Sequence, residues 1–349
     1  MEKKIVLFTE IFGNGGIEKV IYDINKKYNT INLCINNTTT LYKDIKTINI
    51  LNKYYKKALI RNILSIIKFK KYFKENECDI LHINTHWAFG YIWAFLAQPY
   101  VKKIIIHAHN SAFESDKYKL KFIINFLIKK IFYNSKYQYI ACSNDAGIFC
   151  LGKVDFKIIY NGIDTNKFLY NENKRKEIRK DLKENSIIIG SVGRFCKQKN
   201  QKFLIDVFYE ILKVNKDAYL IMIGSGNIEE IRNKINNLNI ENNVLIIDKT
   251  EKIDYYYNAF DFFFLPSLFE GFPLCLLEAQ YSNLCCLVSN NIDKNAIIST
   301  MSFPLELNVN LWVKTFLKHI SYDRENVVCS PKFSLNNFLN EIDKIYKEG

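Results

Sequence analysis

The chain has 349 residues, of which 48% are apolar. This length favours two domains, because a single hydrophobic core rarely grows past about 250–300 residues. The nine cysteines are odd in number and form no Cys-x-x-Cys pair, which argues against a disulfide framework or a zinc site and fits a reducing cytoplasm. No apolar run approaches the roughly 20 residues that span a bilayer, and the first strand pattern begins too early to leave room for a signal peptide.

The net charge of +13 is concentrated in two stretches of the N-terminal half. Residues 41–80 hold 10 Lys or Arg against 4 Asp or Glu, and residues 101–140 hold 8 against 2. Such an excess predicts an anionic partner for this half of the chain. No RNA- or DNA-binding motif accompanies the charge, so nucleic acid is not the expected partner.

Short β-branched and aromatic runs alternate with longer helical patterns along the first half of the chain. Strands are predicted at residues 4–9, 31–35, 79–84, 103–107, 137–141 and 157–160. Because these runs are almost continuously apolar, they are typical of a parallel sheet that is covered by helices on both faces.

A glycine-rich segment, Gly-Asn-Gly-Gly-Ile-Glu at residues 13–18, follows the first strand and opens a helix. The glycines let the backbone N–H groups of Gly15 and Gly16 approach a phosphate or a sugar at the positive end of the helix. Glu18 stands where a dinucleotide-binding G-x-G-x-x-G motif would need glycine, which weakens the case for a dinucleotide. A tight strand-to-helix turn without any ligand fits the pattern equally well.

Two segments of the first half, residues 59–73 and 117–133, have the pattern of basic amphipathic helices. The second mixes lysines with Phe, Leu and Ile, which suits a helix that lies on an anionic membrane. Each lysine near such a surface contributes about 1 kcal/mol. The alternative is a helix that packs on its own sheet and leaves a solvated basic rim.

Histidines gather at the ends of two neighbouring strands, with His82 and His86 at one and His107 and His109 at the other. An i, i+2 pair on a strand points to one side, but no acidic or cysteine ligand is near in sequence, so no metal site is expected. A packed His107, and a His109 that forms hydrogen bonds to a ligand, fit this pattern better.

The strand–helix alternation repeats in the second half. Strands are predicted at residues 187–192, 219–223, 244–247, 260–265 and 285–288. Residues 166–184 are charged and poor in strand formers, so they are interpreted as a linker that begins near Asn161-Gly162. The two sets of strands predict two Rossmann-like domains.

A basic segment, Gly-Arg-Phe-Cys-Lys-Gln-Lys-Asn at residues 193–200, follows the first strand of the second half and is predicted to open a helix. The planar fork of Arg194 and the point charge of Lys199 suit the oxygens of a diphosphate. The plainer alternative is a solvated basic helix start.

The most informative stretch is Pro266 to Glu278, where two carboxylates, Glu270 and Glu278, flank a turn that runs into an apolar helix start. The residues between them begin with Gly271, Phe272, Pro273 and Leu274. Carboxylates among Phe and Leu side chains need partners, and the hydroxyls of a ribose or hexose are suitable ones. The alternative is a pair of surface charges around a turn. Because ligands bind at the carboxyl ends of parallel strands, all these groups are expected to meet in one cleft between the domains.

Taken in order, these stretches resemble the retaining glycosyltransferases of family 4, and most of all the branch that assembles capsular and exopolysaccharides. The matching residues are the Gly-Gly-Ile-Glu loop, His109, Val192-Gly193-Arg194 with Lys199-Asn200, the junction Asn161-Gly162-Ile163-Asp164, and Glu270 through Glu278. The resemblance implies a GT-B fold, in which two Rossmann-like domains face each other across a deep cleft. It implies an acceptor-binding domain over residues 1–164 and a nucleotide-sugar-binding domain over residues 165–349, with a closing helix that is free to pack back on the first domain.

The resemblance also implies roles for individual residues. Arg194 and Lys199 would neutralise the donor diphosphate, and Glu278 would hold the ribose hydroxyls. Glu270 would orient the transferred sugar, and His109 would contact it near the reacting carbon. Backbone N–H groups of Gly16 and within Phe272–Leu274 would meet the sugar and phosphates, and Gly15, Gly271 and Pro273 would also line the donor site. No metal or other cofactor is expected.

The expected function is transfer of a hexose, with retention, from a nucleotide-diphosphate sugar to a glycan or polyprenyl-linked acceptor in capsule, exopolysaccharide or O-antigen synthesis. A UDP-sugar is favoured over a GDP-sugar. The expected location is the cytoplasm, with the basic helices allowing peripheral association with the anionic inner face of the plasma membrane. Two alternatives stay open: a GT-B sugar-nucleotide epimerase, and a non-catalytic module that binds nucleotide sugars or membranes. Asn283, Cys285 and Asp248 depart from the family pattern and put the geometry of the base pocket in doubt.

Overall fold

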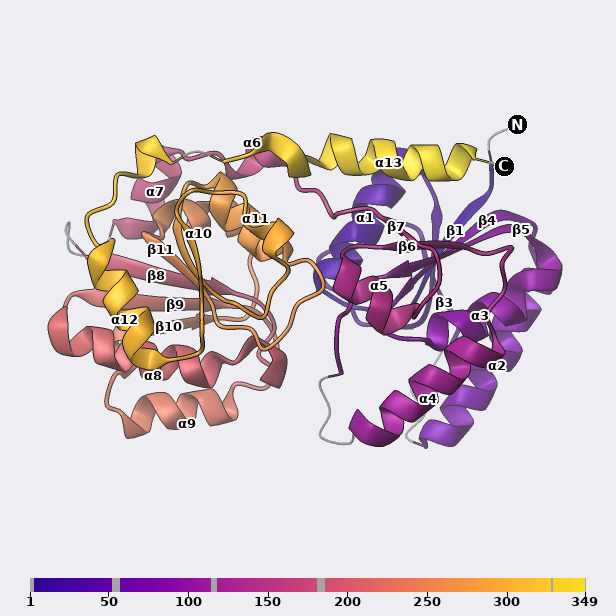
Figure 1. Cartoon of the computed structure of the whole chain (residues 1–349), viewed down its shortest axis with the longest axis horizontal. Coiled ribbons are helices and arrows are strands. Elements are labelled where there is room, and N and C mark those ends of the chain that lie inside the picture. The colour runs from indigo at the N-terminus through magenta and orange to yellow at the C-terminus, as the bar shows by residue number, and fades with distance from the viewer. Residues whose placement is uncertain (1–2, 52–56, 114–117, 181–185, 328, 349) are drawn as a thin grey trace. The chain divides into compact units, whose positions relative to one another are not determined.

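The computed structural model describes residues 3–51, 57–113, 118–180, 186–327 and 329–348. Its contacts divide the chain into two units (Figure 1). Unit 1 comprises residues 1–161 together with 336–349, and unit 2 comprises residues 162–335. The end of the chain therefore belongs to the first unit rather than to the second.

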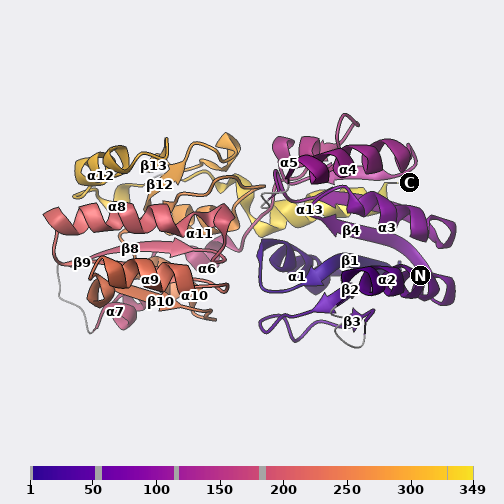
Figure 2. The same cartoon turned by 90° about the horizontal axis from the view of Figure 1, so that it is seen from below.

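Unit 1 is built on a seven-stranded parallel sheet with the strand order β3-β2-β1-β4-β5-β6-β7. Its strands are β1 (Ile5–Phe12), β2 (Ile31–Asn37), β3 (Thr47–Asn49), β4 (Cys78–Thr85), β5 (Val101–Ala108), β6 (Gln138–Ala141) and β7 (Lys157–Ile158). Its helices are α1 (Gly16–Tyr28), α2 (Ala58–Glu75), α3 (Phe89–Ala97), α4 (Tyr118–Ile131), α5 (Asn144–Cys150) and α13 (Leu335–Lys347). Helices α2, α3 and α4 lie side by side on one face of the sheet, and α1 and α13 lie on the other (Figures 1 and 2).

Unit 2 is built on a six-stranded parallel sheet with the order β10-β9-β8-β11-β12-β13. Its strands are β8 (Ile187–Val192), β9 (Ala218–Ile223), β10 (Val244–Ile247), β11 (Phe262–Leu265), β12 (Cys285–Ser289) and β13 (Ser302–Leu305). Its helices are α6 (Thr165–Phe168), α7 (Glu172–Arg179), α8 (Gln201–Val214), α9 (Glu229–Asn237), α10 (Ile253–Ala259), α11 (Leu274–Tyr281) and α12 (Val309–Lys318). The fully buried Phe264, Trp312 and Phe316 join β11 to α12 in the core of this unit.

Both strand orders reverse direction beside the first strand of the unit, which is the Rossmann arrangement. The expectation of two Rossmann-like parallel sheets is therefore confirmed. Two short edge strands, β3 and β13, were not predicted. Three residues are too few to show a period in β3, and β13 contains Pro304, which is tolerated only at a sheet edge.

The interpretation of residues 166–184 as a linker is wrong over the part that the structure describes, residues 166–180. This part forms α6 and α7 and belongs to unit 2. Arg175 and Arg179 of α7 both pair with Asp261 at the start of β11, at 2.5 and 2.9 Å. Because Oδ2 of Asp261, the oxygen that pairs with Arg179, also accepts a hydrogen bond from the N–H of Ile188, the charged segment is tied into the sheet.

The chain passes between the two units twice, near residues 161–162 and 335–336, and the two connecting segments are hydrogen-bonded to each other at Ile163. Its N–H donates to the carbonyl of Phe333, and its own carbonyl accepts from the N–H of Leu335. The two ends of unit 2 are thus hydrogen-bonded to each other.

No helix in the described part of the chain has both the length and the apolar character needed to cross a bilayer.

Candidate active site

The loop between β8 and α8 carries Gly193, Arg194 and Lys199. It does not run directly into a helix as predicted: a single 3-10 turn at Lys197–Lys199 comes first, and Asn200, at φ 53°, ends it before α8 begins at Gln201. Gly193 has φ +155°, and a Cβ there would come within 2.8 Å of Cε of Lys199. Glycine at this position therefore lets the lysine lie against the backbone beside Arg194.

Lys199 forms a buried ion pair with Glu270 from the loop between β11 and α11. Its Nζ lies 2.7 Å from Oε1 of Glu270, and only 15% and 8% of the two side chains are exposed. Gln198 binds the same loop, because its amide donates to the carbonyl of Phe269 at 2.9 Å and to Oε2 of Glu270 at 3.4 Å. The two predicted site residues are thus brought together, and a neighbouring amide fixes the carboxylate.

Burial alone would lower the pKa of Lys199, but its neighbours Cys275 and Glu270 outweigh burial and raise it above the ordinary value. Burial raises the pKa of the Cys275 thiol to about 12, so this thiol is neutral at pH 7. Glu270 is therefore the partner that holds Lys199 as a cation. An ammonium has three donors, so one contact with Glu270 leaves donors for a ligand oxygen.

Glu270 leads through Gly271 into the start of α11, where Pro273 is the N-cap and Leu274 the first helical residue. The fixed backbone of proline suits a helix entry. Phe272 packs edge-on against Phe333 with ring centroids 5.0 Å apart, which holds this turn in place. The first N–H groups of a helix have no partner inside it, so this end of α11 offers donors to an anion or a hydroxyl.

Glu278 lies in the second turn of α11 and is held by Tyr257 of α10. The Tyr257 hydroxyl is 2.8 Å from Oε2 of Glu278 and 3.1 Å from the carbonyl of Cys275. Burial and the neighbouring Glu278 raise the pKa of Tyr257 well above its ordinary value, so the phenol stays a neutral donor. Cys275 lies between the two carboxylates, since its thiol is 3.9 Å from Nζ of Lys199. The pair at 270 and 278 therefore belongs to one cluster.

Arg194 differs from Lys199 because its side chain is exposed. Its carbonyl accepts a hydrogen bond of 2.7 Å from the Gln201 amide, which fixes the backbone of the loop. Among the described residues, no carboxylate lies within ion-pair distance of the guanidinium. Arg194 is therefore a cation on a fixed loop that is available to an anionic ligand.

In unit 1 the buried histidines form a stack that ends at His109. The rings of His82 and His107 lie 5.2 Å apart and nearly parallel, and those of His107 and His109 lie 3.9 Å apart. Nδ1 of His82 is 2.8 Å from the hydroxyl of Tyr346 on α13, and its Nε2 is 3.1 Å from Nδ1 of His107. His107 is thus a packed residue, as predicted, and connects His109 to the last helix of the chain.

The stack holds its imidazoles neutral. Burial lowers the pKa of His82 to about 3, and burial, together with the neighbouring His82 and His86, lowers the pKa of His109 well below its ordinary range. Nε2 of His109 lies 2.9 Å from the amide oxygen of Asn84, which can only accept, so Nε2 carries the proton and Nδ1 is the acceptor. His109 is therefore a neutral side chain with a fixed tautomer.

The glycine loop before α1 is bound by the side chain of Glu18, which lies in the first turn of that helix. Oε1 of Glu18 accepts from the N–H of Gly13 at 3.1 Å, and a Cβ at Gly15 would come within 2.7 Å of Oε2. Gly15 is the N-cap of α1, and Gly16 is its first residue. Because a carboxylate already lies at this helix end, a hydroxyl fits beside Gly16 better than a phosphate does.

Gln198, Tyr257 and Asn84 form hydrogen bonds to predicted site residues but were not named by the sequence analysis. Gln198 adjoins Lys199 within a segment that was singled out, so its position was a usable signal. Tyr257 follows two other tyrosines, and no local pattern separates it from Tyr255 and Tyr256.

In the described part of the chain, no three His, Cys, Asp or Glu side chains are grouped as metal ligands would be.

Two family models match the chain. The model described as Glycosyltransferase Family 4 covers residues 39–167, and the one described as Glycosyl transferases group 1 covers residues 172–299. The capsular polysaccharide biosynthesis glycosyltransferase CapH of Staphylococcus aureus is 31% identical over 80% of this chain and 79% of its own length. The chain belongs to the family 4 glycosyltransferases. The resemblance drawn from the motifs is confirmed, and the protein is an enzyme of the glycosyltransferase class.

Other relatives of this family 4 glycosyltransferase have more specific names. The UDP-Gal:alpha-D-GlcNAc-diphosphoundecaprenol alpha-1,3-galactosyltransferase of Escherichia coli is 29% identical over 72% of this chain and 68% of its own length. HepE of Anabaena, solved in complex with UDP and glucose, has a TM-score of 0.83 at 18% identity and covers 99% of this chain and 100% of its own. At that identity the likeness shows the fold, which is GT-B as expected.

Proposed function

We propose that this glycosyltransferase moves a hexose, with retention of configuration, from a UDP-sugar to a polyprenyl-linked glycan acceptor during capsule, exopolysaccharide or O-antigen synthesis. The observation that supports this most is the cluster in unit 2, where an exposed cation, a buried ion pair and a second carboxylate come together at the carboxyl ends of β8 and β11. The named relatives act in capsule synthesis or on a diphosphoundecaprenol acceptor, and HepE has been solved with UDP and glucose.

In this proposal Arg194 and Lys199 take the donor diphosphate. As the glycosidic bond breaks, negative charge develops on the leaving phosphate, and preorganised cations stabilise it at little reorganisation cost. Lys199 is already held in position by Glu270, so it does not need to be ordered when the donor binds. Unit 2 would then be the donor domain.

The two carboxylates take hydroxyl groups. Glu278, whose second oxygen is held by Tyr257, accepts from the ribose hydroxyls, and Glu270 accepts from the transferred sugar. The N–H groups of Phe272 and Leu274, on either side of Pro273 at the start of α11, meet the phosphate or the sugar. Neither carboxylate is assigned as a nucleophile, since each already has a hydrogen-bonding partner that fixes it.

His109 contacts the transferred sugar in this proposal, through Nδ1 as an acceptor and through its backbone. Because the imidazole stays neutral, it adds no positive charge that would oppose the positive character of the reacting carbon. Unit 1, which carries His109 together with Gly15 and Gly16, would be the acceptor domain.

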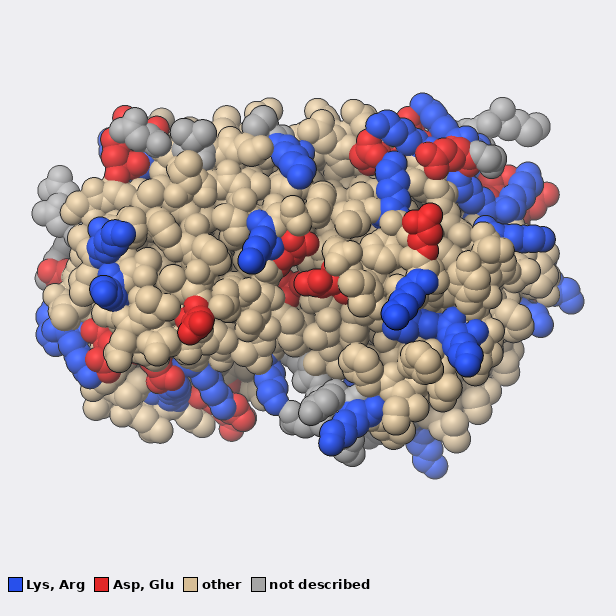
Figure 3. All heavy atoms as spheres, viewed as in Figure 1, with Lys and Arg blue, Asp and Glu red and all other residues tan. Residues whose placement is uncertain are grey.

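Unit 1 is also proposed to lie on an anionic membrane. Helix α4 carries four lysines and no acidic residue, and exposes Leu120, Phe122, Ile123, Phe126 and Ile131, each by more than half. Helix α2 exposes Leu59, Ile63 and Ile67 among its basic residues. Figure 3 shows blue side chains spread over a tan surface where Figure 1 draws α4. Lys117, at the start of the predicted segment, lies outside the described residues.

The test is transfer of sugar from UDP-sugars to a polyprenyl-diphosphate-linked acceptor. Replacing Glu278 by Gln should lower kcat/KM for the donor about 10- to 100-fold, as expected for loss of a charged hydrogen bond. Glu229→Gln on the exposed start of α9 is the matched control. Conversion of the sugar nucleotide without acceptor would instead indicate an epimerase, and donor binding without any product would indicate a binding module.

A further inference from the structure

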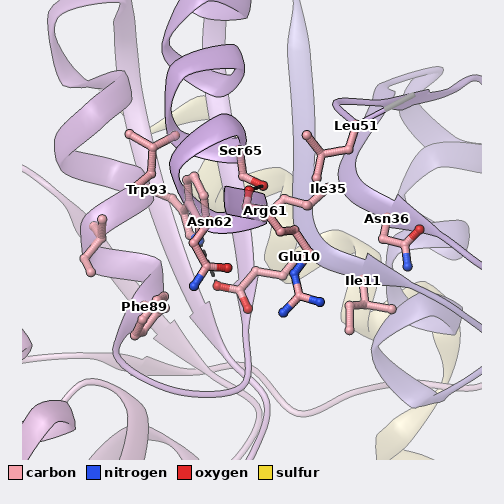
Figure 4. Close-up of a pocket in the computed structure, with 12 residues that line it drawn as sticks. Glu10, Ile11, Ile35, Asn36, Leu51, Arg61, Asn62, Ser65, Phe89 and Trp93 are labelled. Atoms are coloured by element: carbon pink, nitrogen blue, oxygen red, sulfur yellow. Dashed lines mark hydrogen bonds between the residues drawn. The ribbon is translucent and has the colours of Figure 1, made fainter. Parts of the chain in front are cut away.

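Unit 1 contains a cavity of about 220 Å³ that none of the assignments above uses. It lies between the ends of β1 and β2 and the first turns of α2 and α3 (Figure 4). Its walls are mostly apolar, from Ile35, Leu51, Ile66, Ile92 and Trp93. The volume is below the roughly 300–1,000 Å³ of pockets that enclose a whole ligand, so it suits one end of a larger molecule.

The polar groups of this cavity gather at one side. Figure 4 shows the ends of Glu10, Arg61 and Asn62 on the same side, with Phe89 and Ile11 beside them. No carboxylate of the described residues lies within ion-pair distance of Arg61. A half-buried guanidinium above apolar walls is suited to a phosphate that carries an alkyl chain.

The carboxyl group of Glu10 binds Trp93 and forms no ion pair with Arg61 in the described structure. It accepts a hydrogen bond of 2.9 Å from the indole N–H of Trp93. Burial raises the pKa of Glu10 despite that hydrogen bond, which shifts the carboxyl toward its neutral form.

The exposed face of α2 continues the apolar wall. Leu59, Ile63 and Ile67 lie four residues apart on one side of the helix, next to the cavity residues Asn62 and Ile66, and all three are exposed. Residues at this spacing share one helix face. An alkyl chain that leaves the cavity would therefore find an apolar track along α2.

The cavity also lies at the same edge of the sheet as His109. The cavity lies at the carboxyl end of β1, and His109 follows β5, two strands away in the order β1-β4-β5. Neighbouring strands are about 4.8 Å apart, so the separation across the sheet is roughly 10 Å. The cavity and His109 therefore lie along the same edge of the sheet, where ligands of parallel sheets bind.

We infer that this cavity binds the diphosphate and the first isoprene units of an isoprenoid-diphosphate-linked acceptor, with Arg61 on the diphosphate. The inference rests on the proposed function and adds the subsite that recognises the lipid end of the substrate. A free phosphate would contact Arg61 but not the apolar walls, and a neutral lipid would contact the apolar walls but not Arg61.

The test is calorimetric titration of the full chain with farnesyl diphosphate in excess UDP, which keeps the nucleotide site occupied. Farnesyl diphosphate should bind, whereas pyrophosphate and farnesol should each bind at least about tenfold more weakly. Arg61→Met should weaken binding about tenfold or more, as expected for loss of a charged hydrogen bond. Lys70→Met, which removes an exposed charge from the same helix, should stay within about twofold of the parent.

Equal binding of pyrophosphate and farnesyl diphosphate, or an Arg61→Met variant that binds like Lys70→Met, would overturn the inference. Circular dichroism of each variant separates a binding loss from a folding loss, and Arg61→Lys should restore part of the affinity. If UDP does not bind but the farnesyl diphosphate pattern appears, the proposed function fails while the cavity assignment stands. If UDP binds and Arg61→Met has no effect, only the cavity assignment fails.

Discussion

The ion pair between Lys199 and Glu270 couples the stability of unit 2 to its proposed chemistry. Replacing Lys199 by Met would leave a buried carboxylate without its cation, which costs about 3–5 kcal/mol. Chemical denaturation should therefore show a large loss for Lys199→Met and a partial recovery for the double variant with Glu270→Gln. Donor turnover should be lost in both, and the exposed Lys197→Met serves as the control. Full turnover in the double variant would contradict the roles proposed for this pair.

The histidine stack predicts an acid-sensitive unit 1. Since the native pKa values of these imidazoles lie below the unfolded value of about 6.5, the unfolded state binds more protons between those limits. Stability is therefore intact above about pH 6.5 and falls as the pH drops toward the native values, by up to about 1.4 kcal/mol per pH unit for each histidine.

The measurement is the urea midpoint of the chain and of His107→Phe at pH 7.5, 6 and 5. The variant removes one titrating ring from the stack, so its stability should fall less steeply with decreasing pH. Parallel curves for the two proteins would show that His107 takes up no extra proton on unfolding.

At the scale of single elements, α4 is the helix that most needs a partner surface. Replacing both Phe122 and Phe126 by Ser should weaken binding to anionic vesicles at least about tenfold, because burial of each Phe contributes about 1.5–3 kcal/mol. Cosedimentation with vesicles would measure this, with Leu245→Ser on exposed β10 as the control. High salt should also release the protein. Unchanged binding in the double variant would remove α4 from the proposed membrane face.

The central strands could be predicted because burial on both faces makes them nearly continuous apolar runs, as in β8, whose bounds match the prediction, and in the fully buried β12, which extends one residue beyond it. Strands β3 and β13 lack that signal, since β3 has only three residues and β13 contains Pro304, whereas the edge strand β10 keeps a continuous apolar run. The helix α7 looked like a linker because its arginines find their carboxylate, Asp261, some 80 residues later. Local pattern cannot show a partner so far along the chain.

The same limit applies to the site. Lys199 and Glu270 could be named from their segments, because each follows a strand at the edge where ligands bind. That they pair with each other, and that Tyr257 holds Glu278, depends on how β8, β11 and α10 pack. Sequence therefore identified the charged residues, whereas their neutral supports required the structure.

At the scale of the whole molecule, unit 2 is one uninterrupted segment, whereas unit 1 needs both ends of the chain. Residues 162–335 expressed alone should fold and be stabilised by UDP, by about 2.7 kcal/mol at 100 times the dissociation constant. A chain that stops at Leu335 should lose stability in unit 1, since Tyr346 no longer meets His82. Thermal unfolding with and without UDP tests both. A fragment without a cooperative transition would contradict the first expectation.

The hydrogen bonds that join Ile163 to Phe333 and Leu335 bring the two ends of unit 2 together. A segment whose two ends lie next to each other can be replaced as a unit, because the rest of the protein has to accommodate only two neighbouring chain connections. Recombination at these two points between related genes would replace the proposed sugar-nucleotide half while leaving α13 and the rest of unit 1 unchanged. Under the proposed function, such an exchange would let the same acceptor receive a different sugar and so produce a new polysaccharide repeat unit.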